Sequence, residues 1–260
     1  MKNTVYFFYM LFASLVSSAG MLYAQHEFNK SYYGENIRQI AFPIGGMGAG
    51  MFCLEGNGSL SHFSLRHKPD MNNRPFIFAA LTVKGLPDGA RIAEGPVQPW
   101  RLFGEEGTAN GGRLYGCPRF DKAVFSARFP FAQVELEDVS LPVRVTIKGW
   151  SPFIPGDADN SSLPAGVLEY KLINSLNKAI DLVFSFHSSN LMRMEQPSVW
   201  GGQYVGRDSV MAIPGGFILS QACLPGKPWY RGDFAIWTDE PSAVIDYCWF
   251  RGGWFDARTL

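Results

Sequence analysis

The sequence has no excess of charge of either sign. Lysine and arginine together number 23, aspartate and glutamate also number 23, and charged residues make up only 18% of the chain. Nucleic acids and anionic membrane surfaces are bound through clustered basic side chains, and no run of like charges occurs here. The composition therefore predicts neutral or apolar partners, with no nucleic acid among them.

The spacings that mark metal and redox sites are also missing. The four cysteines are Cys53, Cys117, Cys223 and Cys248. They form no C-x-x-C pair, and the four histidines show no ligand spacing, so we predict no metal and no cofactor. Four cysteines allow three disulfide pairings in an exported chain, whereas Cys53, in an apolar strand, equally fits a buried free thiol.

Helical periodicity is the third absence. After the N-terminal segment, no window of twelve residues keeps an apolar i, i+3, i+4, i+7 stripe without an interrupting glycine or proline. The chain instead contains 28 glycines and 17 prolines, which punctuate short apolar runs. We predict an all-β fold, an antiparallel β-sandwich of about ten or more strands with few short helices.

Strict alternation of apolar and polar residues locates the clearest strands. Residues 133–137 and 143–148 alternate in this way and predict a hairpin with one solvated face, closed by a turn at 138–142. Residues 168–172 and 182–186 repeat the pattern and predict a second hairpin. The remaining strands are predicted at 51–54, 76–83, 124–129, 217–222 and 234–238.

The N-terminal segment 1–24 has the features of a signal peptide. It has Lys2, an apolar run at 5–16 and small residues before Ala24, and the apolar run is too short to span a bilayer. We predict export, to the periplasm or outside the cell, with residues 25–260 as one β-domain and no integral membrane span. An uncleaved N-terminal anchor is the alternative.

A glycine-rich loop precedes the predicted strand at 51–54. Gly45, Gly46, Gly48 and Gly50 allow positive φ angles and the close approach of another segment. The phosphate-binding pattern G-x-G-x-x-G fails, because Met51 stands where its last glycine would have to be and no helix follows. The following Asn57-Gly58 pair predicts a hairpin turn.

Glycoside hydrolysis needs two carboxyl groups, about 5 Å apart in retaining enzymes, one of which stays protonated. The candidates are Glu135, Glu137, Asp138, Asp157 and Asp159. The first three fall on the solvated face of a predicted hairpin, where carboxylates are mostly solvated surface groups. The loop at 157–160 begins like a calcium loop but lacks the required glycine and closing glutamate, so a turn capped by its Asp and Asn side chains is favoured.

Two segments carry a family resemblance, FPIGGMGAG at 42–50 and WSPFIPGDADNSSLPAGVLEYKLINS at 150–175. From about Arg38 to its end the chain is similar to the N-terminal domain of family 116 glycoside hydrolases, which include non-lysosomal glucosylceramidase and bacterial β-glucosidases. In that family the nucleophile and the acid/base lie in a C-terminal (α/α)6 barrel. The resemblance implies that this chain holds no catalytic residue, and it assigns no substrate-binding residue.

The C-terminal stretch is rich in aromatic residues and ends without a cap or a polar tail. Four of the seven tryptophans lie there, namely Trp229, Trp237, Trp249 and Trp254. We expect the chain to stop short of a helical catalytic domain, which would be its partner, in cis or in trans, in acting on a glycoside. The alternatives are a carbohydrate-binding sandwich that acts alone and an independently active enzyme that uses Asp157 or Asp159.

Overall fold

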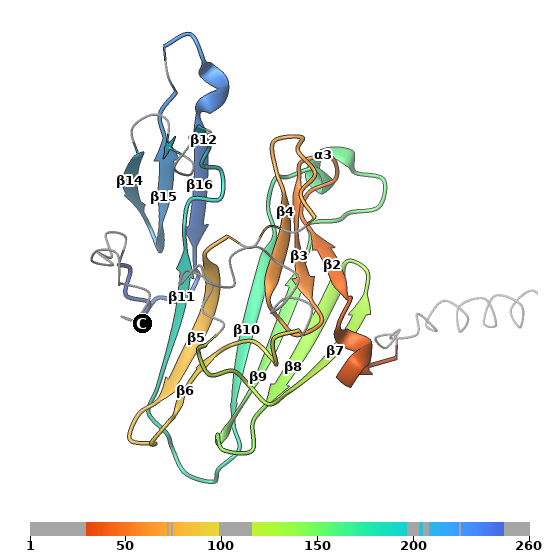
Figure 1. The fold of residues 1–260 in the computed structure, drawn as a ribbon, viewed down its shortest axis with the longest axis vertical. Helices are drawn as coiled ribbons and strands as arrows, with labels where there is room; N and C mark the ends of the chain where they lie inside the picture. Colours follow the sequence, from red (N-terminus) through yellow and green to blue (C-terminus); the bar gives the residue numbers. More distant parts are fainter. Residues whose placement is uncertain are drawn as a thin grey trace, which may run out of the picture.

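The structure is a computed structural model that describes residues 30–71, 73, 75–98, 116–196, 203–204, 208–223 and 225–246. Strands dominate this part of the chain (Figure 1). Its helices are three short ones, the 3₁₀ helices η1 (Gly34–Ile37) and η2 (Pro228–Tyr230) and the α-helix α3 (Ala158–Ser161). The all-β prediction is confirmed. The segment 1–24, Cys248, Trp249 and Trp254 lie outside the described residues.

One layer is a five-stranded antiparallel sheet. Its order is β1 (Tyr32–Tyr33), β7 (Lys122–Arg128), β8 (Phe131–Glu137), β9 (Val143–Trp150) and β10 (Val167–Asn174). The predicted hairpin β8–β9 is confirmed, with Val134 opposite Ile147 and Leu136 opposite Val145. These four side chains are fully buried, because alternation places them all on the inner face of the sheet.

Two three-stranded sheets cover that inner face (Figure 1). They are β2 (Ala41–Ile44), β3 (Met51–Glu55) and β4 (Leu60–Ser64), and β11 (Leu182–Ser188), β5 (Ile77–Val83) and β6 (Ala90–Ile92). A Cβ at Gly149 of β9 would lie 2.4 Å from Ile44 Cδ1, and the Tyr170 ring of β10 packs 5.1 Å from Phe184 of β11. Both contacts join the two layers around one hydrophobic core.

The second predicted hairpin is wrong. Strand β10 pairs with β9, Val167 opposite Trp150, whereas β11 pairs with β5, Leu182 opposite Val83. The connection at 175–181 therefore passes from one layer of the sandwich to the other. Alternation defines which face of a strand is buried but does not identify its neighbour, so adjacency in sequence was misleading here.

A fourth antiparallel sheet lies outside the hydrophobic core. It consists of β14 (Asp208–Ile213), β15 (Gly216–Gln221) and β16 (Gly232–Trp237), and β12 (Glu195–Gln196) pairs with β13 (Gln203–Tyr204) nearby in the chain. Among the described residues, neither the buried core nor the side chains packed on it include a member of β14–β16. Gln221 exchanges two hydrogen bonds with the backbone of Met194, at 2.8 and 2.9 Å, so the attachment includes buried polar contacts.

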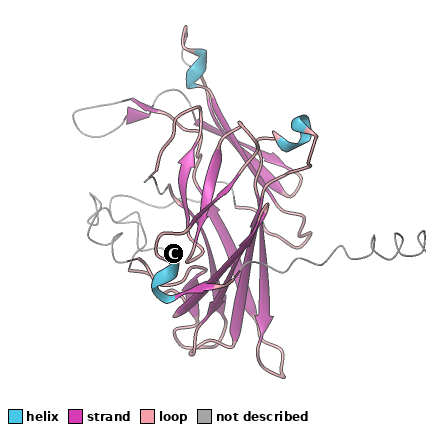
Figure 2. Cartoon of the chain, turned by 90° about the vertical axis from the view of Figure 1, so that its right-hand side faces the viewer, coloured by secondary structure: helices cyan, strands magenta, loops and turns pink. Residues whose placement is uncertain are grey.

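No helix within the described ranges is long and apolar enough to cross a bilayer. Figure 2, turned by 90°, shows that η2 and α3 both lie at the upper end of the molecule, whereas η1 lies lower. Two of the three short helices of the described residues therefore lie at the same end of the molecule.

His187 of β11 is expected to make stability depend on pH. Its ring stacks on Phe78, 4.6 Å between centroids, and burial lowers its pKa from the ordinary value of 6.5. The unfolded chain then takes up the proton first, so stability present above pH 6.5 is lost as the pH falls, by at most about 1.4 kcal/mol per unit of pKa difference. Denaturant titrations between pH 7.5 and 5 should show a smaller loss in His187→Phe.

The exposed His67 provides the control for this measurement. His67→Asn suits the positive φ of 55° at this position and should leave the pH dependence of stability unchanged. Equal slopes of stability against pH in wild type and His187→Phe would contradict the assignment.

Candidate functional site

The two segments that carry the resemblance lock together at the upper end of the sandwich. The backbone N–H of Gly45 donates to Ser151 Oγ at 3.0 Å, and that of Met47 donates to the carbonyl of Ser161 at 2.8 Å. Between these bonds, Gly46 lies so close that a Cβ there would be 2.0 Å from the carbonyl oxygen of Leu163. The prediction of close approach is confirmed at Gly46, whose partner is the proline-rich loop, whereas no atom lies within 4 Å of a Cβ placed at Gly48.

The proline-rich loop, residues 151–166, is itself rigidly built. Asp157 caps α3 by accepting from the backbone N–H of Asn160 at 3.0 Å, as the sequence predicted. The buried Ser161 hydroxyl accepts from Ile154 N at 2.9 Å and donates to the carbonyl of Ile154 at 3.1 Å, which closes the loop on itself. The hydrogen bonds from the side chain and backbone of Asn160 lower the pKa of Asp157. This carboxyl is held ionised, so it is a poor general acid.

Four large apolar side chains are exposed on this end and form what we call the apolar end. They are Met47, Phe129, Ile154 and Leu163, each between 49% and 61% exposed. Phe129 is placed there by the β7–β8 turn, and its ring packs edge-on against Phe153, 4.8 Å between centroids. Exposed apolar residues gathered on a rigid surface are typical of sites where another protein surface docks.

The carboxylates of the β8–β9 hairpin differ among themselves. Glu135 accepts a hydrogen bond from Gln133, and Glu137 lies 3.7 Å from Arg144; both are exposed, as predicted. Asp138 was predicted to lie on the solvated face, and that prediction is wrong. Its carboxylate is 2% exposed and accepts a hydrogen bond of 2.8 Å from Arg91 Nε.

The burial of Asp138 has a cause that lies far away in the sequence. Burial by itself would raise the pKa of Asp138, but the hydrogen bonds from Arg91 and from the side chain and backbone of Ser140 outweigh it and lower the pKa. Arg91 belongs to β6, in the other layer of the sandwich. The pair therefore joins the two layers and holds Asp138 ionised.

The candidate carboxylates do not converge on one site. Strand β9 runs from Val143, next to the turn that holds Asp138, to Trp150, next to the loop that holds Asp157 and Asp159. Eight residues of strand span roughly 25 Å, far more than the roughly 5 Å between the carboxyl groups of a retaining glycosidase. Asp138 and Asp157, whose pKa values are both lowered, therefore lie next to opposite ends of β9 and cannot form a catalytic pair.

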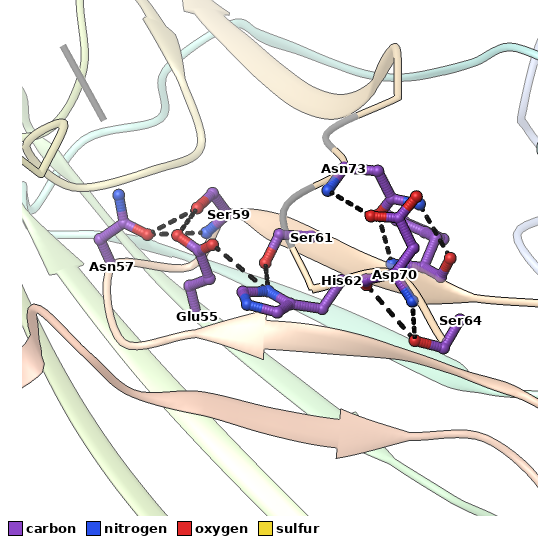
Figure 3. A network of polar contacts seen from close by, with 9 residues as sticks. Glu55, Asn57, Ser59, Ser61, His62, Ser64, Asp70 and Asn73 are labelled. Atoms are coloured by element: carbon purple, nitrogen blue, oxygen red, sulfur yellow. Dashed lines mark hydrogen bonds and ion pairs between the residues drawn. The ribbon is translucent and has the colours of Figure 1, made fainter. Parts of the chain in front are cut away.

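A buried polar network in the β3–β4 hairpin was not predicted from the sequence (Figure 3). The carboxylate of Glu55 accepts a hydrogen bond of 2.8 Å from the Ser59 hydroxyl, which also contacts Asn57 Oδ1 at 2.8 Å. The Asn57-Gly58 pair predicted the turn correctly. Glu55 and Asn57 are both buried, and a distant segment covers the turn, since Gly95 N donates to the carbonyl of Asn57 at 2.7 Å.

This network contains the residue types of a hydrolytic triad, with His62 between Ser61 and Glu55. Ser61 Oγ lies 2.5 Å from His62 Nδ1, and Glu55 Oε1 lies 3.9 Å from the same nitrogen (Figure 3). A working triad places the serine and the carboxylate on opposite ring nitrogens, so that one nitrogen can take the serine proton while the carboxylate orients and stabilises the ring through the other. The arrangement therefore fits a hairpin held by polar contacts rather than an activated nucleophile.

The second half of the network fixes the loop after β4. The side chain of Asn73 pairs with Phe63 as a neighbouring strand would, accepting from its N–H at 2.6 Å and donating to its carbonyl at 2.8 Å (Figure 3). Asp70 in turn accepts from the backbone N–H of Asn73 and donates its own N–H to Ser64 Oγ. These bonds give the loop a defined shape at the same end as the glycine-rich loop, since Ser64 lies beside Gly50.

No group of three or more His, Cys, Asp or Glu side chains that could hold a metal ion occurs in the described ranges. The cysteines Cys53, Cys117 and Cys223 are free thiols, and burial together with the nearby Glu55 raises the pKa of Cys53 to about 11. Cys53 is thus an unreactive side chain of the core, the second of the two alternatives.

A protein-family model described as beta-glucosidase 2, glycosyl-hydrolase family 116 N-term matches residues 41–253. The matched stretch contains both the glycine-rich loop and the proline-rich loop that interlock at the apolar end. No curated protein matches the chain.

Proposed function

The chain belongs to the family of N-terminal domains of family 116 glycosyl hydrolases, and we propose that it is the non-catalytic β-sandwich of an exported β-glycosidase. Membership in this family implies a companion catalytic domain. We propose that this partner is a helical (α/α)6 domain, joined in cis or in trans, which hydrolyses a β-glucoside or a related glycolipid. The apolar end would be the surface that supports it.

The observation that carries this proposal is the interlock beneath the apolar end. A docking surface must keep its shape before the partner arrives, because ordering it on binding costs free energy. The bonds from Gly45 and Met47 and the capped turn at Asp157 supply that order. Covering four half-exposed large side chains would contribute roughly 3 to 6 kcal/mol, taking about half the value for full burial of each.

The carboxylates support the same division of labour. A glycosidase acid must have a raised pKa, whereas hydrogen bonds lower the pKa of both Asp138 and Asp157. The residues that cleave the glycosidic bond would then belong to the partner. The proposal of an enzyme that acts alone through Asp157 or Asp159 has less support, because Asp157 is already used to cap α3.

The test combines an activity measurement with an association measurement. We expect this chain alone not to hydrolyse aryl β-glucosides, and we expect light scattering to show a complex when the helical domain is added as a separate chain. Replacing Met47 and Leu163 together by serine should weaken association at least about tenfold, which corresponds to 1.4 kcal/mol. Val139→Ser, just beyond the opposite end of β8 and even more exposed to solvent, should change it less than about twofold.

Two results would contradict the proposal. One is turnover by the chain alone that Asp157→Asn or Asp159→Asn abolishes, which would identify an independent enzyme. The other is equal weakening by the serine pair and by Val139→Ser, which would mean that the apolar end is not the docking surface.

Export is a separate part of the proposal, supported by the composition of residues 1–24. We expect cleavage after Ala24, so that intact-mass measurement of periplasmic or secreted protein gives a chain that begins at Gln25 or a near neighbour. A full-length chain that begins at Met1 and is recovered with the membrane would instead support the uncleaved anchor.

A further inference from the structure

A pair of aromatic rings projects from the connection between β15 and β16. Trp229 is 59% exposed and lies in η2, next to the partly exposed Tyr230, 6.4 Å between ring centroids. Pro228 begins this helical turn, and the N–H groups of Tyr230 and Arg231 both donate back within it, at 3.1 Å. The rings are therefore held by an ordered turn at the upper end of the molecule (Figures 1 and 2).

A distant arginine fixes the backbone on which Trp229 stands. The guanidinium of Arg66 donates to the carbonyl of Trp229 at 2.8 Å, to the carbonyl of Arg231, and to that of Met192 at 2.9 Å. Gly232 completes the contact, because a Cβ there would lie 2.2 Å from the carbonyl oxygen of Met192 and 2.6 Å from Arg66 Nη2. The Arg66 guanidinium thus binds three carbonyl groups. These bonds hold the backbone of Trp229 in place while its ring remains exposed.

Charged groups of both signs lie close to the two aromatic residues in the chain. Arg231 Nε donates to Asp233 Oδ2 at 2.9 Å, and both side chains are exposed. Lys227 places its ammonium group 5.7 Å from the centre of the Tyr230 ring. The turn therefore combines an exposed aromatic ring with hydrogen-bond donors and acceptors on neighbouring residues.

This combination has a definite chemical complement. A pyranose ring has one apolar face of C–H groups, which packs on an indole, and a rim of hydroxyl groups, which bind planar carboxylate and guanidinium groups through paired hydrogen bonds. Nucleic acid would require an excess of cations, which the chain lacks. We propose that Trp229, with Arg231 and Asp233, forms a binding site for a neutral glycan.

The other exposed tryptophan of this sheet has different surroundings. Trp237 of β16 lies opposite Gly216, and the register places Ile218 and Met211 on the same sheet face. Trp237 therefore lies on a sheet face that also presents these two apolar side chains. Of these two tryptophans, Trp229 is the one on an anchored turn with an ion pair just after it in the chain, and Trp237 serves as its matched control.

The glycan site does not depend on the apolar end being the docking surface. It does extend the proposed function, because η2 and α3 lie at the same end of the molecule, so a glycan held by Trp229 would be kept on the side where the catalytic domain is proposed to dock (Figures 1 and 2). The site would then supply substrate affinity that the catalytic domain does not need to provide.

The test uses this chain alone, with β-linked gluco-oligosaccharides of three to five units as the probe and ligand-observed NMR and calorimetry as readouts. We expect binding that Trp229→Ala weakens at least tenfold, that Trp229→Phe partly keeps, and that Trp237→Ala changes less than twofold. The double variant Arg231→Ala with Asp233→Ala keeps the Trp229 ring and should also weaken binding. It provides a second test of the site if Trp229→Ala fails to fold.

Three outcomes would overturn the proposal: no binding of the oligosaccharides by the wild-type chain, undiminished binding in a folded Trp229→Ala, or equal losses in Trp229→Ala and Trp237→Ala. Each is distinct from a failure of the proposed function, because association with the helical domain is measured without sugar.

Discussion

Replacing Gly46 by alanine is expected to lower the free energy of unfolding by about 3 kcal/mol or more. The added methyl group would lie 2.0 Å from the carbonyl oxygen of Leu163 and 2.8 Å from the carbonyl carbon of Ser162. Both neighbours are backbone atoms, so no side-chain rotation relieves the contact and the two loops must separate. Separation strains or breaks the bond from Met47 N to the carbonyl of Ser161. Denaturant unfolding measures the loss directly.

The control is two residues away in the same loop. Gly48 has a φ of 72°, and no atom lies within 4 Å of the place that an added methyl group would take, so Gly48→Ala tests backbone strain without a clash. We expect that variant to cost about 1 to 2 kcal/mol. Similar losses in the two variants would mean that loop strain, and not the interlock with Leu163, determines stability at the apolar end. If Gly46→Ala loses more stability than Gly48→Ala, it should also weaken association with the helical domain.

The sequence predicted those features that depend on local pattern. The alternation at 143–148 identified the inner face of β9, because the period of a strand is a property of the strand alone. The glycine-rich loop indicated close approach, because a glycine is required wherever backbones nearly touch. Asp157 was expected to cap a turn because its side chain reaches backbone N–H groups only a few residues ahead.

The features that escaped prediction all depend on residues far apart in the chain. Strand β11 pairs with β5, about a hundred positions before it, and nothing between residues 168 and 186 signals that choice. The turn of the hairpin that holds the buried Glu55 is covered by Gly95, and the Trp229 turn is anchored by Arg66. The residues next to a carboxylate or an arginine in the sequence do not indicate a distant partner. Its burial can therefore be known only from the three-dimensional packing.

Asp138 gives the sharpest test of such a distant partner. Asp138→Asn keeps the shape of the side chain but removes its charge, which leaves Arg91 in the interface between β6 and the β8–β9 turn without its counter-ion. Arg91 keeps its bonds to the carbonyls of Asp88 and Ala90 and to Ser140 Oγ. We therefore expect a loss of about 2 to 3 kcal/mol, somewhat less than for a fully buried pair, measured by denaturant unfolding at pH 7.

The pH dependence separates the charge of Asp138 from its shape. Because its folded-state pKa lies below the ordinary 3.8, the stability it contributes is present above about pH 4 and is lost as the pH falls through 3.8 toward the folded pKa. The difference between wild type and Asp138→Asn should therefore shrink on acidification. The neighbouring Glu137→Gln, whose exposed carboxylate lies 3.7 Å from Arg144, should cost less than about 0.5 kcal/mol at pH 7. Equal losses in the two variants would show that the carboxylate between the layers contributes no more than one on the surface, and the assignment of Asp138 as the bond between the two layers would then be wrong.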